Sequence, residues 1–337
     1  MKLNRDIEFD TIKEYLKSDY DYFESQVRTE LYSEVDILNK VNDYILSNTG
    51  KKLRPALVFL AARACSDDIN ENVRICAAVS ELIHNATLLH DDVVDDSDKR
   101  RGALTVKSLV SPGASVLIGD YWLSRAIDLL VDNSCDYSIL RNYSLTIKNL
   151  CKGELLQMEK ASSLDTTLED YYNIIKWKTA QLFIAAAKSG AMAVNASKEQ
   201  VNAIEEYALN LGLAFQIKDD ILDYSPSNVI GKDSGSDIAE RKITLPMFCA
   251  FDNPNAKNRI ISLLSRIDST QSSTSERNSP YVNGVIDIVK QEKGIEKAEK
   301  ILISHIEKSI NCIKILPDTF SKKALASLAL FVDQRKF

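Results

Sequence analysis

Aspartate residues gather at the end of an apolar segment, in the stretch HDDVVDDSDKRRG. Asp91 and Asp95 are four residues apart, and Asp92 lies three before Asp95, so a helix would place these carboxylates on one face. Each like-charge pair at such a helix end costs about 0.2–0.5 kcal/mol, and the helix dipole adds a similar cost. A cation must therefore compensate. Considered alone, the motif equally fits a solvated acidic helix end that Arg100, Arg101 and water neutralise.

A second motif, FQIKDDILD, places Asp219, Asp220 and Asp223 at the end of another apolar segment. Two such motifs are unlikely to occur by chance in one chain, because both carry the same electrostatic cost. Magnesium prefers oxygen ligands and is typically held by one or two carboxylates together with substrate phosphates. With three histidines and six scattered cysteines, a zinc site or a His-rich phosphohydrolase site is disfavoured. The two motifs predict a magnesium and diphosphate site.

Basic residues accompany both motifs and suit phosphate binding. They are Lys51 and Arg54 in TGKKLRP, Arg100 and Arg101 after the first motif, Lys178 in WKTAQ, and Lys232 after the second motif. Each of these cations alone fits an ordinary surface charge. His84 stands seven residues before Asp91, on nearly the same helical face, where it could bind substrate or be a hydrogen-bonded core histidine.

The elements that would position these residues are almost all helices, because apolar residues recur every three or four positions. The predicted segments are 8–22, 24–47, 53–65, 72–95, 115–131, 138–160, 168–194, 198–223, 243–251, 255–267, 281–290 and 294–313. Long strand-like alternation is not evident in the sequence. We therefore predict an all-α, multi-helix bundle in one domain, 1–337, although length alone favours two domains. The Ser-rich stretch 265–280 is expected to be a mobile surface loop.

Composition excludes several classes of protein. The chain has 337 residues, 45% of them hydrophobic, and a net charge of −6, which argues against nucleic-acid binding through a general basic surface. Its N-terminal stretch lacks an apolar signal region, and apolar runs are too short to span a membrane. The cysteines contain no C-x-x-C pair and suit reduced thiols, so a cytoplasmic location is expected.

The ordered motifs GKKLRP, HNATLLHDDVVDDSDKRRG, CKGELLQ, WKTA, FQIKDDILD and GKDSGSDIAERKITLP resemble those of the trans-polyprenyl diphosphate synthases. They are most like the long-chain octaprenyl type that makes quinone side chains, and they span residues 40–250. The resemblance implies an all-helical isoprenoid synthase fold, a homodimer, and about three Mg²⁺ ions between two facing aspartate motifs. Thr49 and Ile243 depart from the family's usual glycine and proline, but neither removes a charged ligand. The short first motif argues against the eukaryotic-type geranylgeranyl synthases.

The same resemblance implies the residue roles. The metal ligands would be Asp91, Asp92, Asp95, Asp219, Asp220 and Asp223. The partners of the allylic diphosphate would be Arg100, Lys178 and Lys232, and those of isopentenyl diphosphate would be Lys51, Arg54, His84 and Arg101. The catalytic side chains near the reacting atoms would be Lys178, Thr179, Gln216 and Lys232.

Product length is expected to depend on residues one turn before Asp91, which the growing tail would meet first. In the family, small residues there accompany long products, so Ala86 and Thr87 predict six to ten isoprene units, with eight favoured. The next turn would present Leu82 and Ile83, and the floor would be Tyr143 or Ile147. A small residue at position 86 could instead serve close helix packing.

The expected reaction begins when an allylic diphosphate, with farnesyl diphosphate the expected primer, loses its diphosphate while cations stabilise the developing charge. The double bond of isopentenyl diphosphate then attacks, and the departing diphosphate takes the proton because the motifs offer no obvious side-chain base. Three alternatives are a farnesyl or geranylgeranyl synthase, a terpene cyclase, and a non-catalytic subunit. A second diphosphate site counts against the cyclase, and intact aspartate motifs count against the non-catalytic subunit.

Overall fold

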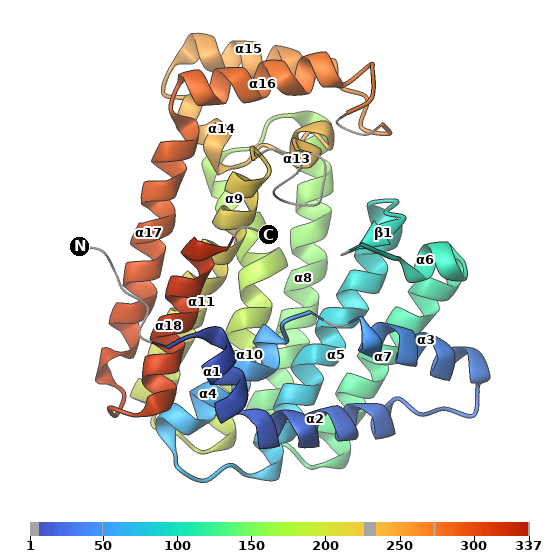
Figure 1. Cartoon of the computed structure of the whole chain (residues 1–337), viewed down its shortest axis with the longest axis vertical. Helices are drawn as coiled ribbons and strands as arrows, with labels where there is room; N and C mark the ends of the chain where they lie inside the picture. The colour runs from blue at the N-terminus through green and yellow to red at the C-terminus, as the bar shows by residue number, and fades with distance from the viewer. Residues whose placement is uncertain (1–6, 49, 101, 226–233, 272–273, 336–337) are drawn as a thin grey trace.

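The computed structural model describes residues 7–48, 50–100, 102–225, 234–271 and 274–335. These residues form a helical bundle with one short hairpin (Figure 1). The helices are α1 (Phe9–Tyr15), α2 (Lys17–Glu30), α3 (Asp36–Ser47), α4 (Leu53–Cys65), α5 (Glu71–Val94), α6 (Val106–Leu109), α7 (Pro112–Asp132), α8 (Tyr137–Ser163), α9 (Leu168–Ile175), the π-helical η1 (Lys176–Ala180), α10 (Gln181–Ala193), α11 (Lys198–Leu222), α13 (Ser236–Ala239), α14 (Leu245–Ala250), α15 (Pro254–Leu264), α16 (Ser279–Gln291), α17 (Gly294–Cys312), the 3₁₀ turn η2 (Ile313–Ile315) and α18 (Phe320–Gln334). The all-α prediction is confirmed.

Helix α10 lies at the centre of the bundle, in contact with α4, α5, α8 and α11. Its sequence, QLFIAAAKSGAMA, is apolar on nearly every face, as expected for a helix surrounded by others. Small residues allow the close approach: a Cβ added at Gly190 would lie 2.2 Å from the carbonyl oxygen of Val58 in α4. Helices α5 and α11 end in the two aspartate motifs, and the η1 turn that carries Lys178 leads directly into α10, so this packing positions the candidate site.

A second, smaller hydrophobic cluster joins α13, α14, α15 and α16, at the top of Figure 1. Gly235 precedes α13 with φ of 76°, a conformation that suits glycine, and a Cβ there would lie 2.4 Å from Val282 Cγ1 in α16. The segment after the second aspartate motif is therefore packed onto this cluster. Phe248 and Ile295 pack against both clusters, which supports the proposal of one continuous domain.

Several predicted helix boundaries are wrong. The segment 24–47 is two helices, because Ser33 and Asn39 pair with each other: Ser33 N donates to Asn39 Oδ1 over 3.0 Å and Asn39 Nδ2 donates to Ser33 O over 2.7 Å. The segment 8–22 is likewise divided at Leu16, which connects α1 to α2. The segment 168–194 comprises α9, η1 and α10, so a π-helical turn interrupts the expected α-helix.

Several elements were missed by the periodicity, the short helices α6 and α13 among them. Helix α18 was not predicted, and β1 (Lys99–Arg100) pairs antiparallel with β2 (Ala103–Leu104) directly after the first aspartate motif. Within the Ser-rich stretch, turns and bends precede α16 as expected for a loop. Asn278 in this stretch is fully buried and donates to the carbonyl oxygens of Asp268 and Gln271. The mobility of the stretch stays a prediction.

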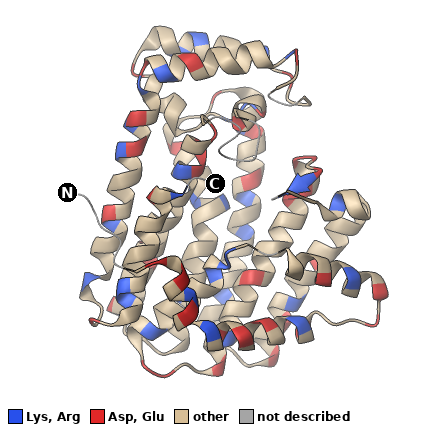
Figure 2. Cartoon of the chain, in the orientation of Figure 1, with Lys and Arg blue, Asp and Glu red and all other residues tan. Residues whose placement is uncertain are grey.

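Acidic and basic positions are interspersed over the described helices in Figure 2, in agreement with the modest net charge. Of the helices in the described ranges, none combines the length and the apolar character that crossing a bilayer requires.

Candidate active site

The first aspartate motif lies at the C-terminal end of α5, where Asp91 is partly buried, Asp92 is buried and Asp95 is exposed. The hairpin that follows turns the chain back, and Arg100 Nε donates to Asp92 Oδ1 over 2.8 Å. Arg100 thus supplies one of the cations that the sequence requires. Burial raises the pKa of Asp91 to about 6; Lys178 opposes this effect, and Glu154 adds to it.

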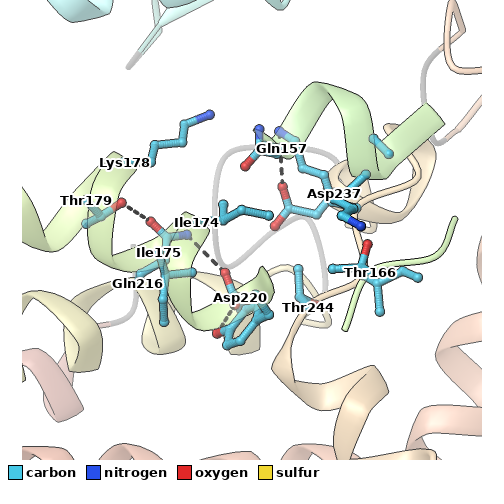
Figure 3. A pocket seen from close by; sticks show the side chains of 15 residues that line it. Gln157, Thr166, Ile174, Ile175, Lys178, Thr179, Gln216, Asp220, Asp237 and Thr244 are labelled. Atoms are coloured by element: carbon cyan, nitrogen blue, oxygen red, sulfur yellow. Dashed lines mark hydrogen bonds and ion pairs between the residues drawn. The ribbon is translucent and has the colours of Figure 1, made fainter. Parts of the chain in front are cut away.

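The second motif lies at the end of α11, where Asp220 is buried and accepts two hydrogen bonds (Figure 3). Tyr171 Oη donates to Asp220 Oδ2 over 2.6 Å, and Gln216 Nε2 donates to Oδ1 over 3.0 Å. Gln216 in turn accepts from Thr179 Oγ1 over 2.6 Å. Burial and the nearby Asp237 raise the pKa of Asp220 to about 7. A hydrogen-bonded chain therefore connects the helix of Lys178 with the second motif.

The other two aspartates of this motif face different partners. Ser236 Oγ donates to Asp223 Oδ1 over 2.9 Å, whereas the buried Oδ2 finds no hydrogen-bond partner in the described part of the chain. Burial and Asp237 raise the pKa of Asp223. Asp219 Oδ1 lies 3.0 Å from Arg335 Nη1, beyond the end of α18. The motif therefore contacts two separate regions of the site.

A cavity of about 100 Å³ lies beside Asp220, and Figure 3 shows the side chains around it. Lys178 and Lys242 line it together with Thr179, Gln216 and Asp237. Lys178 Nζ also pairs with Glu154 Oε2 at 2.5 Å.

The Lys242 ammonium interacts electrostatically with the first aspartate motif and with the segment that follows the second. Burial lowers the pKa of Lys242, but Asp237, Glu240 and Asp95 together outweigh that effect and raise it above its ordinary value. Lys242 thus interacts with Asp95 of the first motif and with the segment after the second.

A second group of cations gathers around three phenylalanines on the far side of Asp219. The Arg54 guanidinium lies 5.0 Å from the Phe183 ring, and Arg335 lies 3.9 Å from the Phe215 ring. The two rings are 5.2 Å apart. Lys51 Nζ lies 4.8 Å from the ring of Phe331, and its pKa is lowered by burial and by Arg335. Lys51, Arg54 and Arg335 therefore form one basic group, distinct from the cavity with Lys178.

The structure brings together most of the predicted residues that it describes. The residues with contacts either around the cavity of Lys178 or at the basic group are Lys51, Arg54, Asp91, Asp92, Arg100, Lys178, Thr179, Gln216, Asp219, Asp220 and Asp223. His84 is partly buried on α5, on nearly the same helical face as Asp91. Its role stays a prediction. Ala86, Leu82, Ile83 and Tyr143 are fully buried, while Thr87 and Ile147 are partly buried. Arg101 and Lys232 lie outside the described residues.

Sequence reasoning missed five side chains of the site: Glu154, Tyr171, Asp237, Lys242 and Arg335. Three of them stand inside the motifs CKGELLQ and GKDSGSDIAERKITLP, so the motifs contained the signal although no role was assigned. The basic pair in QRKF was the only sequence signal for Arg335.

The donor set suits a hard divalent cation, although the protein alone does not complete a metal site. Among the residues described, no three His, Cys, Asp or Glu side chains lie close enough together to hold a metal ion. The buried, unpaired Oδ2 of Asp223 and the raised pKa values of Asp91 and Asp220 are what uncompensated carboxylates show. Magnesium commonly uses one or two carboxylates and obtains further ligands from water and substrate phosphates. The residues present fit such an ion.

The site thus places carboxylates and ammonium groups around one cavity in a helical bundle, the combination that a metal-complexed diphosphate needs. A model of the polyprenyl synthetase family matches residues 35–278. Octaprenyl diphosphate synthase of Escherichia coli is 34% identical, covering 96% of this chain and 98% of that protein. The short chain isoprenyl diphosphate synthase of Methanothermobacter thermautotrophicus is 32% identical, covering 89% and 91%.

The crystal structure of a polyprenyl synthase from Caulobacter crescentus, complexed with calcium and isoprenyl diphosphate, has a TM-score of 0.88 to this chain. It is 29% identical, and the match covers 98% of both chains. The chain therefore belongs to the polyprenyl synthetase family, whose members are trans-prenyltransferases. The resemblance predicted from the motifs is confirmed.

Proposed function

We propose that this chain is a magnesium-dependent prenyltransferase that condenses isopentenyl diphosphate successively onto an allylic diphosphate, with farnesyl diphosphate as primer. The product would be an all-trans polyprenyl diphosphate of about eight isoprene units, for quinone side chains. The observation that carries the proposal is the shared environment of the two aspartate motifs: Asp91 interacts with Lys178, and Lys178 lines the cavity of Asp220. The similarity to octaprenyl diphosphate synthases supports the long product.

About three Mg²⁺ ions would be held by the carboxylates of Asp91, Asp92, Asp95, Asp219, Asp220 and Asp223 together with substrate oxygens. When bound, they would supply the positive charge that stabilises the departing diphosphate. Arg100, Lys178 and Lys232 would bind the same diphosphate through charge-assisted hydrogen bonds. The buried Asp223 Oδ2 supports this assignment, because a cation would satisfy it.

The hydrogen-bonded chain from Thr179 through Gln216 to Asp220 would orient the groups beside the reacting carbons. The Thr179 hydroxyl donates to the Gln216 carbonyl oxygen, and this fixed pair lines the cavity together with Ile174 and Ile175. These apolar neighbours would exclude water, which would otherwise trap the allylic cation as an alcohol. The proton lost after attack would leave with the diphosphate, as the sequence suggests.

Isopentenyl diphosphate would bind to the basic group of Lys51 and Arg54, assisted by His84 and Arg101. This partition is supported by the separation of that group from the cavity: Asp219 faces Arg335, whereas Asp220 faces the Lys178 side. Two diphosphate sites are what chain elongation needs, and a terpene cyclase needs one.

A shorter product, of farnesyl or geranylgeranyl length, is the second candidate, because a relative at 32% identity is a short chain synthase. Ala86 and Thr87 favour the longer product, since small side chains near the first motif would leave a passage for the tail. Tyr143 would lie further along that passage. A homodimer is part of the proposal and is supported by exposed apolar side chains on α7 and α8.

The test is an assay with purified protein, Mg²⁺, farnesyl diphosphate and labelled isopentenyl diphosphate, followed by chromatography of the dephosphorylated alcohols. We expect chain-extended products, and we expect Asp91→Ala and Asp219→Ala to lower turnover by orders of magnitude while helical circular dichroism is unchanged. The exposed Asp132→Ala on α7 is the matched control and should keep full activity. Cyclic hydrocarbons would indicate a cyclase, and absence of turnover by the native protein would indicate a non-catalytic subunit.

A further inference from the structure

Four basic residues stand just before α4 or within it, and they divide between two parts of the molecule. They are Lys51, Lys52, Arg54 and Arg63. Lys51 and Arg54 belong to the basic group described above, where they face rings of α18 and α10. Lys52 and Arg63 instead pair with carboxylates of α2. The chain therefore directs the adjacent side chains of Lys51 and Lys52 to different helices.

The backbone of Lys52 makes this division possible. Lys52 precedes the first residue of α4 with φ of 50° and ψ of 46°, which is the left-handed conformation. A residue with a Cβ rarely adopts it, because the Cβ then lies too close to the following carbonyl oxygen. Such a conformation persists only where the surrounding structure holds it. The Lys52 side chain forms no capping hydrogen bond to α4, so the contacts that hold this backbone must come from another element.

Tyr20 of α2 contacts this backbone directly. Its Oη donates to the carbonyl oxygen of Lys52 over 3.1 Å. The same oxygen accepts the first hydrogen bond of α4, from Ala56 N over 3.2 Å. The Tyr20 ring packs edge-on against Phe23 and Phe59, with 6.4 Å between the ring centroids in each pair. The hydroxyl is therefore held in place by two aromatic neighbours, one on α2 and one on α4.

The Tyr20 hydroxyl is well suited to hold a carbonyl group. Burial and the nearby carboxylates of Glu81 and Glu24 raise the pKa of Tyr20, so the hydroxyl keeps its proton and remains a donor at neutral pH. The other contact of Lys52 with α2 is weaker. Its Nζ pairs with Glu24, whose side chain is 49% exposed, and an ion pair open to water contributes little. Of these two contacts, the one to the backbone carbonyl is therefore the stronger.

We propose that Tyr20 is a positioning residue for the isopentenyl diphosphate site: it holds Lys52 in the left-handed conformation that directs Lys51 into the basic group. The inference rests on the proposed function, which takes that group to bind isopentenyl diphosphate. Because Lys51 directly precedes Lys52, a different φ at Lys52 would carry the Lys51 ammonium away from α18. The described side chains that line the cavity of Lys178 lie between positions 157 and 244, so the allylic site does not depend on this turn.

The proposal is tested with Tyr20→Phe, which removes the hydroxyl and keeps the ring against Phe23 and Phe59. The KM for isopentenyl diphosphate should rise about fivefold, as expected for the loss of one hydrogen bond, while the KM for the allylic substrate and kcat change by less than about twofold. Tyr22→Phe is the matched control. Tyr22 lies on the same helix but donates to Glu71 of α5, so this variant should keep both KM values.

A second substitution separates positioning from a general loss of stability. Glycine adopts the left-handed conformation without steric cost, so in a Lys52→Gly background the effect of Tyr20→Phe on the KM for isopentenyl diphosphate should shrink to less than about twofold. In a Lys52→Ala background, where the Cβ remains, the effect should stay about fivefold. Lys52→Val disfavours the left-handed conformation further and should raise the same KM even when Tyr20 is present.

Equal changes in both KM values of Tyr20→Phe would overturn the positioning role. So would native KM values in a folded Tyr20→Phe protein, or the same rise in the Lys52→Gly and Lys52→Ala backgrounds. Absence of any chain extension by the native protein would instead overturn the proposed function. Thermal melting identifies a variant that does not fold. If Tyr20→Phe does not fold, Lys52→Val against Lys52→Ala decides, and equal KM values for isopentenyl diphosphate in these two variants would overturn the proposal.

Discussion

Asp220 illustrates what burial does to a single carboxylate in this site. It accepts hydrogen bonds from Tyr171 and Gln216, yet burial raises its pKa to about 7, against 3.8 for an unperturbed aspartate. Between those two pH values the folded protein holds a proton that the unfolded chain releases. Stability of the metal-free protein should therefore fall as the pH rises from about 4 to about 7, because ionisation favours the unfolded chain.

We predict that Asp220→Asn stabilises the metal-free protein at pH 8 by roughly 1–3 kcal/mol and that this gain disappears toward pH 4. Asparagine preserves the contacts, since its oxygen can accept from Gln216 and its amide can donate to Tyr171. Urea unfolding at the two pH values measures the difference. The exposed Asp132→Asn should show no such pH dependence, and an equal effect of Asp220→Asn at both pH values would contradict the prediction.

The two groups of cations should have separable kinetic roles. Alanine at Lys51, Arg54 or His84 should raise the KM for isopentenyl diphosphate at least tenfold more than the KM for the allylic substrate, because one charge-assisted contact to a diphosphate is lost. Lys178→Ala and Lys232→Ala should instead raise the KM of the allylic substrate or lower kcat. Lys52→Ala, which removes the pair with Glu24, is the control next to Lys51. Equal changes in the KM of both substrates for the variants at Lys51, Arg54, His84, Lys178 and Lys232 would disprove the two-site partition.

The sequence predicted these residues to different degrees, for a physical reason. Asp91, Asp92 and Asp95 are close in sequence, so helical periodicity alone places them together, and Arg100 follows Asp92 by only eight residues. Tyr171 reaches Asp220 from 49 positions away, and Arg335, which reaches Asp219, directly follows a helix that the periodicity missed. Contacts of this kind depend on tertiary packing, which local spacing does not encode.

At the scale of elements, the π-helical turn η1 is the feature that positions Lys178. A π-helical turn inserts extra backbone into an α-helix and is frequently found at functional sites. The η1 turn faces α8 at Gly153, where a Cβ would lie 2.7 Å from Lys178 N and 3.0 Å from Trp177 Cβ. The absence of a side chain at Gly153 therefore sets how closely η1 approaches Glu154.

We predict that Gly153→Ala lowers kcat at least tenfold by moving η1 and misplacing Lys178, while it lowers the free energy of unfolding by roughly 1–3 kcal/mol. Steady-state kinetics and urea unfolding measure the two effects. Gly113→Ala is the control, since a Cβ at that helical glycine meets nothing within 4 Å. Full activity of Gly153→Ala would show that η1 can shift without consequence.

Helix α4, helix α5 and helix α11 could be predicted because their apolar periodicity continues without interruption to a cap or a motif. The break after α2 could not, because it depends on the pairing of Ser33 with Asn39, and the same residues are compatible with a helix. The η1 turn was not predicted for a similar reason. Apolar periodicity predicts that the helix continues, but it does not distinguish a π-helical turn, which holds one extra residue, from an α-helical one.

At the scale of the whole molecule, apolar side chains remain exposed on α7 and α8, two helices that follow one another and contact each other. On α7 these include Leu117, 70% exposed, and Val131; on α8 they include Tyr137, Leu155 and Met158. Residues 117 and 131 are two heptads apart, and 137 and 158 are three, so each set forms a stripe along its helix. Exposed apolar side chains that gather along neighbouring helices commonly mark interfaces between subunits.

We therefore predict that the native protein is a homodimer through this α7 and α8 surface and that Leu117→Asp raises the dimer dissociation constant at least a hundredfold. In a self-complementary interface each substitution acts twice, and a carboxylate buried there without a partner loses its hydration. Sedimentation equilibrium over a range of protein concentrations measures the constant. Leu168→Asp, at an exposed leucine on α9, should leave it unchanged. A monomeric native protein at micromolar concentration would refute the dimer, and an unchanged constant in Leu117→Asp would place the interface on another surface.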